Sequence, residues 1–210
     1  MSDAPGARPL ARSPVHPPAP VVQRSGWEVS ARRSQAALRL ADRSPLAKVL
    51  VRAPAGGRVA VRLGVAMGAA RYGGDGSLVV GSGPGEWLLL AAPGTATEVS
   101  ARIDADDDGL VTVLDLTHGR ALVRLTGADA AATLATVCPI DLGRSSSGTA
   151  FRSTVAGVVT DVVRDDLGRA TSYLLHCERS SGQSLVDALL DAGREHGIDL
   201  DGFCYPEVMT

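Results

Sequence analysis

A strand followed by a helix occurs twice in the hydrophobic pattern of this chain. Residues 86–103 (EWLLLAAPGTATEVSARI) and residues 172–190 (SYLLHCERSSGQSLVDALL) each contain an aromatic-led apolar run, then a turn, then apolar positions at helical spacing. One face of the second helix carries Leu185, Val186, Leu189 and Leu190. The repetition predicts two related strand–helix units, and chance similarity of two such units is the alternative.

Both helices begin at a capping-box sequence. Thr95 stands three positions before Glu98, and Ser180 stands three positions before Gln183. In such a pair each side chain can bond the backbone N–H of the other residue. Gly197 can terminate the second helix. We therefore expect capped helices that start at Thr95 and at Ser180.

A shorter pattern also repeats. Gly57–Gly64 (GRVAVRLG) resembles Gly119–Gly127 (GRALVRLTG), and both are predicted as strands. A helix follows the second copy, starting at Thr126-x-x-Asp129 and stopping at Pro139. Its apolar face carries Ala130, Leu134, Val137 and Cys138. These elements predict an α+β fold with mainly antiparallel sheet and two related halves, over about residues 57–104 and 110–198.

The two ends of the chain differ from its middle. Residues 1–43 are rich in Pro and Arg and are predicted to be a disordered leader, because such a segment cannot offset its ordering entropy. Residues 44–200 form the predicted domain, although SPLAKVLVRAP near its start fits either a helix or a strand. The tail 201–210 contains Phe203, Tyr205, Val208 and Met209. It either docks on a partner or folds back over its own domain.

Composition narrows the class of protein. The chain is 45% hydrophobic but only 3% aromatic, so Ala, Val and Leu must supply most of the core. A net charge of −2 argues against a nucleic-acid surface or a basic membrane patch. Cys138, Cys177 and Cys204 are odd in number and far apart, which argues against disulfides or a thiolate zinc site. With no apolar run of ~18 residues and a leader too interrupted by prolines for a signal peptide, we expect a reduced, cytoplasmic protein.

An acidic segment has nearly the spacing of an EF-hand calcium loop. It runs from Asp104 to Asp115 (DADDDGLVTVLD), with Gly109 at the sixth position. An EF-hand needs a helix after the loop, whereas the residues that follow are β-branched and alternate, as in a strand. An extended segment would hold Asp108 and Asp115 too far apart to close a calcium cage. We therefore predict a solvated helix-to-strand loop, and a calcium-modulated domain is the alternative.

Glycine-rich and histidine positions form no ligand pattern. Gly81–Trp87 (GSGPGEW) precedes a strand rather than a helix, which predicts a hairpin turn instead of a phosphate loop. The histidines are His16, His118, His176 and His196. His176 and Cys177 are adjacent on a strand and should face opposite sides. With no Ser/His/Asp relay or nucleophile elbow either, we predict no catalytic, cofactor-binding or metal-binding residue in this chain.

The stretch Val113–Leu142 resembles the folate-dependent aminomethyltransferase superfamily, which includes the T-protein of glycine cleavage. The pattern in that superfamily is Asp-x-Ser-His, a strand, Gly-x-Asp-Ala, a helix and an Asp. The matching positions here are Asp115, Thr117, His118, Gly127, Asp129, Ala130 and Asp141. The residues alone suggest that His118 belongs to a hydrogen-bonded turn.

Within this superfamily, residues Ser44–Ile198 are most similar to the gamma-subunit family of heterotetrameric sarcosine oxidase. The similar stretches are RSPLA at Arg43–Ala47, GPGEWLLLAAP at Gly83–Pro93, CPIDL at Cys138–Leu142, and SGQSLVDALL near the end. The resemblance implies a fold like the N-terminal domain of a T-protein, with ferredoxin-like repeats. It also implies larger alpha and beta subunits and a small delta subunit as partners, carrying flavins, NAD, tetrahydrofolate and zinc, and no cofactor on this chain.

Two stretches depart from the family pattern. Val65–Gly76 is shorter, as if a helix of the first half were missing. T-proteins position the folate with an Asp-Asp pair. The corresponding stretch of this chain, Ala156–Val163 (AGVVTDVV), has only Thr160 and Asp161 at these positions. We therefore predict that Asp161 is a solvent-facing strand residue.

These observations favour a non-catalytic assembly subunit of a complex that oxidatively demethylates sarcosine or a related N-methyl amine. The alternative is a stand-alone folate-binding transferase or regulator of the T-protein type, which needs a central pocket with Asp161 pointing inward.

Overall fold

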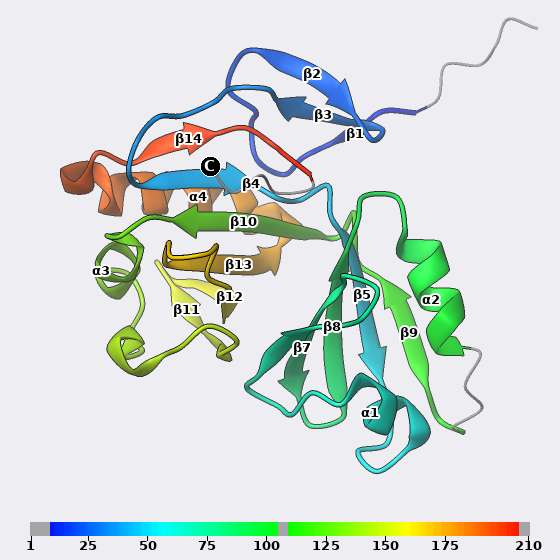
Figure 1. Cartoon of the computed structure of the whole chain (residues 1–210). Helices are drawn as coiled ribbons and strands as arrows, with labels where there is room; N and C mark the ends of the chain where they lie inside the picture. The colour runs from blue at the N-terminus through cyan, green and yellow to red at the C-terminus, as the bar shows by residue number, and fades with distance from the viewer. Residues whose placement is uncertain (1–8, 105–108, 206–210) are drawn as a thin grey trace, which may run out of the picture.

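The computed structural model describes residues 9–104 and 109–205 (Figure 1). Two main sheets pack against each other, helices cover their outer faces, and a small third sheet lies beside the second main sheet. Within the described ranges, no helix combines the length and apolarity required to cross a bilayer.

The first main sheet has five strands in the order β6-β7-β8-β5-β9, all paired antiparallel. They are β5 (Ala47–Arg52), β6 (Ala70–Tyr72), β7 (Leu78–Gly83), β8 (Glu86–Ala91) and β9 (Thr112–Asp115). Two helices belong to this half, α1 (Arg58–Leu63) and α2 (Ala96–Asp104).

The second main sheet has six strands in the order β11-β12-β13-β10-β4-β14. They are β4 (Arg39–Asp42), β10 (Arg120–Thr126), β11 (Ala150–Val155), β12 (Val158–Arg164), β13 (Ser172–Glu178) and β14 (Asp199–Asp201). The β4–β14 pair is parallel and the other pairs are antiparallel. Its helices are α3 (Ala130–Ala135) and α4 (Gly182–Ala192), and single 3₁₀ turns lie at Leu142–Arg144, Arg179–Ser181 and Arg194–His196.

Both halves share a βαββαβ core, which is β5-α1-β7-β8-α2-β9 in the first half and β10-α3-β12-β13-α4-β14 in the second. Each half adds one edge strand after its first helix, β6 in the first and β11 in the second, and β4 is inserted between β10 and β14 in space. The predicted α+β class with mainly antiparallel, ferredoxin-like halves is therefore confirmed. The first half starts with β5, earlier than residue 57, where we placed its beginning.

Three apolar layers stabilise the fold, one on the outer face of each main sheet and one between the two sheets. The outer face of the six-stranded sheet packs under α3 and α4, through residues such as Leu125, Leu134 and Leu185. The outer face of the five-stranded sheet packs under α1 and α2, through residues such as Val59 and Val99. The inner faces meet through a third cluster that includes Leu46, Val80, Leu88, Leu122 and Leu174. Because both faces are covered, β8, β10 and β13 are almost continuously buried, and their sequences are mostly apolar, interrupted by Arg124 in β10 and His176 in β13.

Residues 57–64 form a helix, and our prediction of a strand there was wrong. Val59, Ala60 and Leu63 are buried, while Val61 is exposed. Positions i, i+1 and i+4 share a helix face, so packing against the first sheet outweighs the strand preference of valine. This helix, α1, precedes Val65–Gly76, the stretch where we expected a helix of the first half to be missing.

The predicted capping boxes are replaced by other hydrogen bonds. The Thr95 hydroxyl donates to the carbonyl of Ala92 at 2.8 Å. Helix α4 starts after Ser181, whose side chain makes no capping bond, and Gln183 instead accepts a hydrogen bond from the backbone N–H of His16 at 2.8 Å. The approximate starts of α2 and α4 were right, but the bonds proposed for them were wrong.

The described part of the leader is ordered, contrary to our prediction for residues 1–43. Residues 1–8 lie outside the described ranges. Strands β1 (Ala11–Arg12), β2 (Val21–Arg24) and β3 (Trp27–Ser30) form the third sheet in the order β1-β3-β2, and β4 enters the second main sheet. Trp27 and Val29 are buried with Phe203 from the other end of the chain. This long-range contact supplies the apolar burial that the leader lacks by itself.

The acidic segment leads into a strand, as predicted. Residues 105–108, including Asp108, lie outside the described ranges, but β9 follows them where an EF-hand requires a helix. The helix–loop–helix alternative is therefore wrong. Gly81–Trp87 forms the β7–β8 hairpin, also as predicted.

Candidate functional site

A cleft of about 280 Å³ opens between the two main sheets. We call it the inter-sheet cleft. Its lining comes from both sheets and comprises Leu50, Arg52, Ser82, Glu86, Leu88, Leu116, Arg120, Arg152, Val159, Asp161, His176 and Glu178. This is the place where titratable side chains from both halves converge.

Asp161 and His176 form a pair at the centre of this lining. They face each other across the antiparallel β12–β13 ladder, so their side chains lie on the same face of the sheet. The Asp161 Oδ2 lies 3.3 Å from the His176 Nδ1, and the two side chains are only 16% and 6% exposed. The His176 Nε2 is buried and has no hydrogen-bond partner among the described residues.

Arginines connect this pair to the first sheet. Arg152 binds both carboxylate oxygens of Asp161, at 2.6 and 3.2 Å, and lies 3.7 Å from Glu86. Glu86 in turn pairs with Arg52 at 2.8 Å. The resulting row of charges runs from β5 and β8 of the first sheet to β12 and β13 of the second.

The environment fixes the charge of the central pair. Burial raises the pKa of Asp161, but hydrogen bonds from His176 and Arg152 outweigh it, so its pKa lies below the usual value. Burial lowers the pKa of His176, and Asp161 offsets this only in part. At neutral pH, Asp161 is therefore ionised and His176 is neutral. The contact with the carboxylate places the imidazole proton on Nδ1 and leaves Nε2 as an acceptor.

Asp161 therefore points into the cleft, and our prediction of a solvent-facing residue was wrong. Its neighbour Thr160 is fully buried on the other face of β12, where its hydroxyl donates to the Val158 carbonyl at 3.0 Å. The alternation of a strand separates these two positions. Thr160 thus does not supply the second half of an acid pair in the cleft.

The Asp-x-Thr-His motif builds a turn instead of a reactive site. Asp115 accepts a hydrogen bond from the backbone N–H of Thr117 at 2.8 Å. The Thr117 hydroxyl accepts from the backbone N–H of Lys48 at 3.1 Å. The ring of His118 stacks on Trp27, with centroids 4.8 Å apart and planes 7° from parallel. The motif holds the β9–β10 connection against β5 and against the third sheet, which agrees with the hydrogen-bonded turn expected for His118.

The other motif positions are also structural. Gly127 packs directly against the backbone at Ala37. Asp129 precedes α3 without a side-chain capping bond, and Ala130 is buried beneath that helix. Asp141 accepts a hydrogen bond from the backbone N–H of Gly143 at 3.0 Å. These four residues are absent from the described lining of the inter-sheet cleft.

Lys48 is a buried cation that the sequence pattern alone did not reveal. It is the single lysine of the chain, and it is 0% exposed in the layer between the sheets. Its ammonium donates to the carbonyls of Ser44 and Leu46 at 2.7 and 2.8 Å. Burial lowers its pKa to about 7, against the opposing effect of Asp42 and Asp115. The missed signal is the strand AKVLVR, in which Lys48 occupies an inward-facing position beside apolar residues.

The charge of Asp42 is the largest effect that opposes the lowering of the Lys48 pKa. Burial raises the pKa of Asp42, although the Ser13 hydroxyl and the backbone N–H of Ser44 both donate to its carboxylate. Ser13 belongs to the leader, so its hydrogen bond to Asp42 ties the leader to β4.

Cysteines and the remaining histidines do not assemble a metal centre. In the part of the chain that the structure describes, no group of three or more His, Cys, Asp or Glu side chains could hold a metal ion. Cys138, Cys177 and Cys204 are free thiols. Cys177 lies in the core beneath α4 while His176 faces the cleft, so these neighbours occupy opposite faces as predicted.

Comparison with known proteins supports the superfamily that the sequence suggested. No family model and no curated protein sequence matches the chain. Among solved structures, it is similar to a chain of the heterotetrameric sarcosine oxidase from Corynebacterium sp. U-96 in complex with pyrrole 2-carboxylate. That match has a TM-score of 0.67 and 25% identity, and it covers 79% of this chain and 89% of the other.

A second solved structure shares the fold over a longer part of this chain. It is the glycine cleavage system aminomethyltransferase T from Bartonella henselae, with a TM-score of 0.70 and 18% identity. The match covers 87% of this chain but only 55% of the aminomethyltransferase. The fold of this protein is therefore that of the T-protein-like superfamily.

Proposed function

We propose that this chain is a non-catalytic assembly subunit, of the gamma type, in a complex that oxidatively demethylates sarcosine or a related N-methyl amine. The observation that carries the proposal is the match to a chain of a heterotetrameric sarcosine oxidase, which extends over 89% of that chain. The two chains thus agree in extent as well as in fold, whereas the aminomethyltransferase is almost twice as long as the part matched.

The chemistry of the inter-sheet cleft supports a structural role. Each of its arginines already faces a carboxylate: Arg52 pairs with Glu86, Arg120 with Glu178, and Arg152 with Asp161, at 2.6 to 2.8 Å. Each of these pairs lies within one sheet, and Arg152 reaches across to Glu86 of the other sheet at 3.7 Å. Charges that satisfy one another in this way leave little to bind an ionic substrate.

The alternative function, a stand-alone folate-binding transferase or regulator, has one observation in its favour. Asp161 points into the cleft, as that function requires. However, hydrogen bonds from His176 and Arg152 lower the pKa of Asp161, which makes its carboxylate a weak base. A single carboxylate held in this way fits a folate-handling acid pair poorly.

On the proposed function, the reactive groups reside on other chains. Larger alpha and beta subunits and a small delta subunit would carry the flavins, NAD, tetrahydrofolate and zinc. This chain would contribute surface and rigidity to the assembly.

Co-purification tests the proposal. An affinity-tagged version of the full chain, expressed at its natural level in its own cells, should retain larger subunits in fixed ratio. The retained complex should be yellow and should oxidise an N-methyl amine. The same cells with the untagged chain control for proteins that bind the resin. Recovery of the tagged chain alone, with aminomethyl transfer to tetrahydrofolate, would instead establish the alternative.

A further inference from the structure

A second cavity lies on the opposite side of the five-stranded sheet from the inter-sheet cleft. Its volume is about 470 Å³, which is within the range of small-molecule sites. It is formed where α1, α2, β6 and β7 come together, and we call it the α1–α2 pocket. Its apolar floor consists of Leu63, Val65, Val79, Leu89, Val99 and Ile103, all of which belong to the core beneath the two helices.

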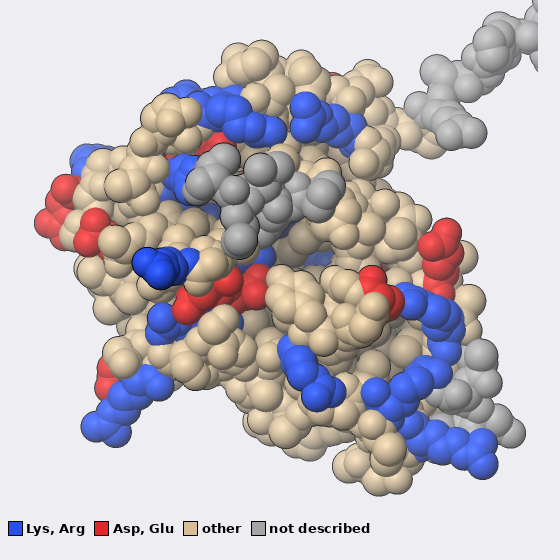
Figure 2. All heavy atoms as spheres, in the orientation of Figure 1, with Lys and Arg blue, Asp and Glu red and all other residues tan. Residues whose placement is uncertain are grey.

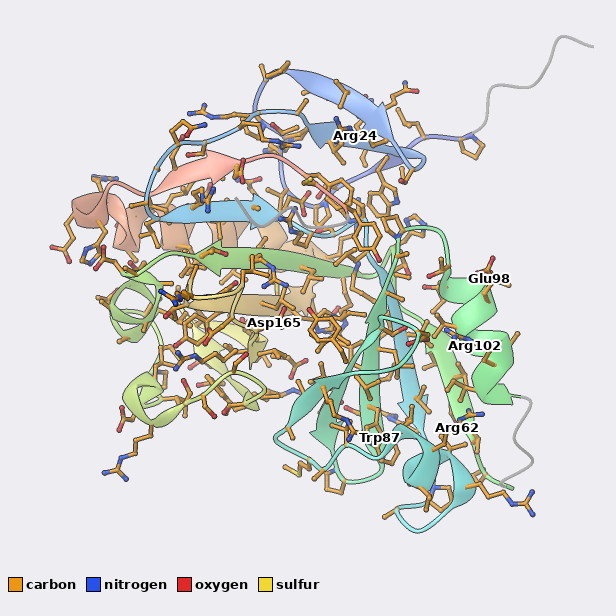
Figure 3. All side chains as sticks on the ribbon, in the orientation of Figure 1. Arg24, Arg62, Trp87, Glu98, Arg102 and Asp165 are labelled. Carbon is orange, nitrogen blue, oxygen red and sulfur yellow. The ribbon has the colours of Figure 1, made fainter. Side chains whose placement is uncertain are left out.

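Arginines from three different elements surround the mouth of this pocket. They are Arg62 of α1, Arg71 of β6 and Arg102 of α2. Figure 2 shows basic side chains gathered over this side of the first sheet, and Figure 3 shows Arg62 and Arg102 on the same side of it. Because the three come from separate segments, the fold brings together a concentration of positive charge that no short stretch of sequence contains.

The described contacts of Arg102 and Arg71 differ in charge. Among the described lining residues the one acid is Asp75, which pairs with Arg102 at 2.7 Å. Asp75 is further occupied by the backbone N–H and the hydroxyl of Ser77, at 3.0 and 2.9 Å. Arg71 donates to the neutral carbonyl of Gly64 at 3.2 Å, so its charge faces the mouth without a described carboxylate. Arg71 is thus the guanidinium of this mouth whose described hydrogen bond goes to a neutral group.

The combination of floor and mouth selects a class of ligand. An apolar floor favours a hydrocarbon or aryl body, because burial of apolar surface is worth about 25 cal/mol per Å². A guanidinium at the mouth favours a carboxylate, with which it forms charge-assisted hydrogen bonds. We propose that the α1–α2 pocket binds a small amphipathic carboxylate, with its apolar body on the floor and its carboxylate on Arg71. The proposal is argued from this chain's own pocket and does not rest on the proposed function.

Matched probes test this site on the full chain. Hexanoate, hexanol and hexylamine share a body and differ in the charged end. Calorimetric titration should give measurable binding of hexanoate, weaker binding of hexanol and the weakest binding of hexylamine. Methyl signals of Val79, Leu89 and Val99 should shift on addition of hexanoate, and methyls of the inter-sheet layer such as Leu122 should not.

Variants locate the anionic end. Arg71→Gln should weaken hexanoate binding by about tenfold or more, since it removes a charge-assisted hydrogen bond to the carboxylate. The control Arg169→Gln changes an exposed arginine outside the pocket and should leave affinity unchanged. Equal affinity for all three probes, equal loss in both variants, or competition by inorganic phosphate at the same concentration would each overturn the proposal. If Arg71→Gln does not fold, the methyl shifts of the unaltered chain decide the question.

Discussion

Gly127 occupies a position that no other residue can fill without distortion. Its φ is +148°, and a Cβ there would come within 2.3 Å of the Ala37 carbonyl oxygen. Gly127→Ala should therefore lower the free energy of unfolding by about 3 kcal/mol or more, measured by urea denaturation. Gly157→Ala is the matched control, since Gly157 also has a positive φ but a Cβ added there would meet no atom within 4 Å; it should cost only about 1 kcal/mol. Equal losses of unfolding free energy in the two variants would show that the close approach of Ala37 does not add to the cost of a side chain at Gly127.

Lys48 should make stability depend on pH. The folded amine has a pKa of about 7 and the unfolded amine has the ordinary 10.5. Between these values the unfolded chain binds more protons, so the free energy of unfolding rises as pH increases. At about 1.4 kcal/mol per pKa unit, the gain from pH 7 to 9 is about 2 kcal/mol. Urea midpoints should show this rise in the natural chain and lose it in Lys48→Met.

A direct titration complements those midpoints. Because Lys48 is the single lysine, isotope-labelled lysine reports its amine alone in an NMR titration. A midpoint near the ordinary value of 10.5 would contradict the burial described here.

At the scale of elements, the C-terminal segment packs against the third sheet. Gly202 and Phe203 donate backbone hydrogen bonds to the carbonyls of Arg32 and Ser30, at 2.9 and 3.0 Å. Phe203 is 3% exposed and packs with Trp27 and Val29. This part of the tail folds back over its own domain, which was one of the two outcomes we considered. Residues 206–210, with Val208 and Met209, lie outside the described ranges.

Loss of this segment should therefore destabilise the chain itself. Phe203→Ala should cost about 3–5 kcal/mol of unfolding free energy, because it empties a buried aromatic position. Truncation after Asp201 should cost at least as much. Tyr205→Ala is the control, since that side chain is 46% exposed and should cost less than about 1 kcal/mol. A truncated chain that keeps its melting temperature would show that the tail is free to dock elsewhere.

At the scale of the whole molecule, a buried ion pair joins the two sheets. Arg124 of β10 and Asp165, which follows β12, lie 2.6 Å apart and are 3% and 6% exposed. Tyr72 of β6 donates to the same carboxylate at 3.0 Å, so the contact spans both halves. Asp165→Ala should lower the free energy of unfolding by about 3–5 kcal/mol, because it leaves the buried guanidinium of Arg124 without its carboxylate. Asp191→Ala breaks an exposed pair with Arg194 and should cost less than about 1 kcal/mol.

The proposed function also makes a prediction for the isolated chain. It should be colourless after purification and should bind neither flavin nor NAD, because the chemistry is assigned to partner subunits. Absorption spectroscopy of the purified chain checks this, and the intact complex is the positive control. A flavin spectrum in a one-to-one ratio with the isolated chain would contradict the assignment of cofactors.

Local periodicity was sufficient for several central elements. The apolar runs of β8, β10 and β13, and the helical spacing in α2, α3 and α4, identified those elements because each one buries a face set by its own sequence. The β-branched residues after the acidic segment predicted β9 for the same reason. The repeated strand–helix pattern was therefore enough to predict the α+β class and its two related halves.

Other features depended on partners far away in the chain. Val59, Ala60 and Leu63 became a helix because the first sheet offers them one face to cover, whereas their composition favours a strand. The leader became ordered because Trp27 meets Phe203 from the opposite end. The direction of Asp161 was decided by its pairing with His176 on β13 and Arg152 on β11. Sequence periodicity determines which face of an element is apolar, but only the packed structure decides what lies against that face, because that choice is made by contacts between distant residues.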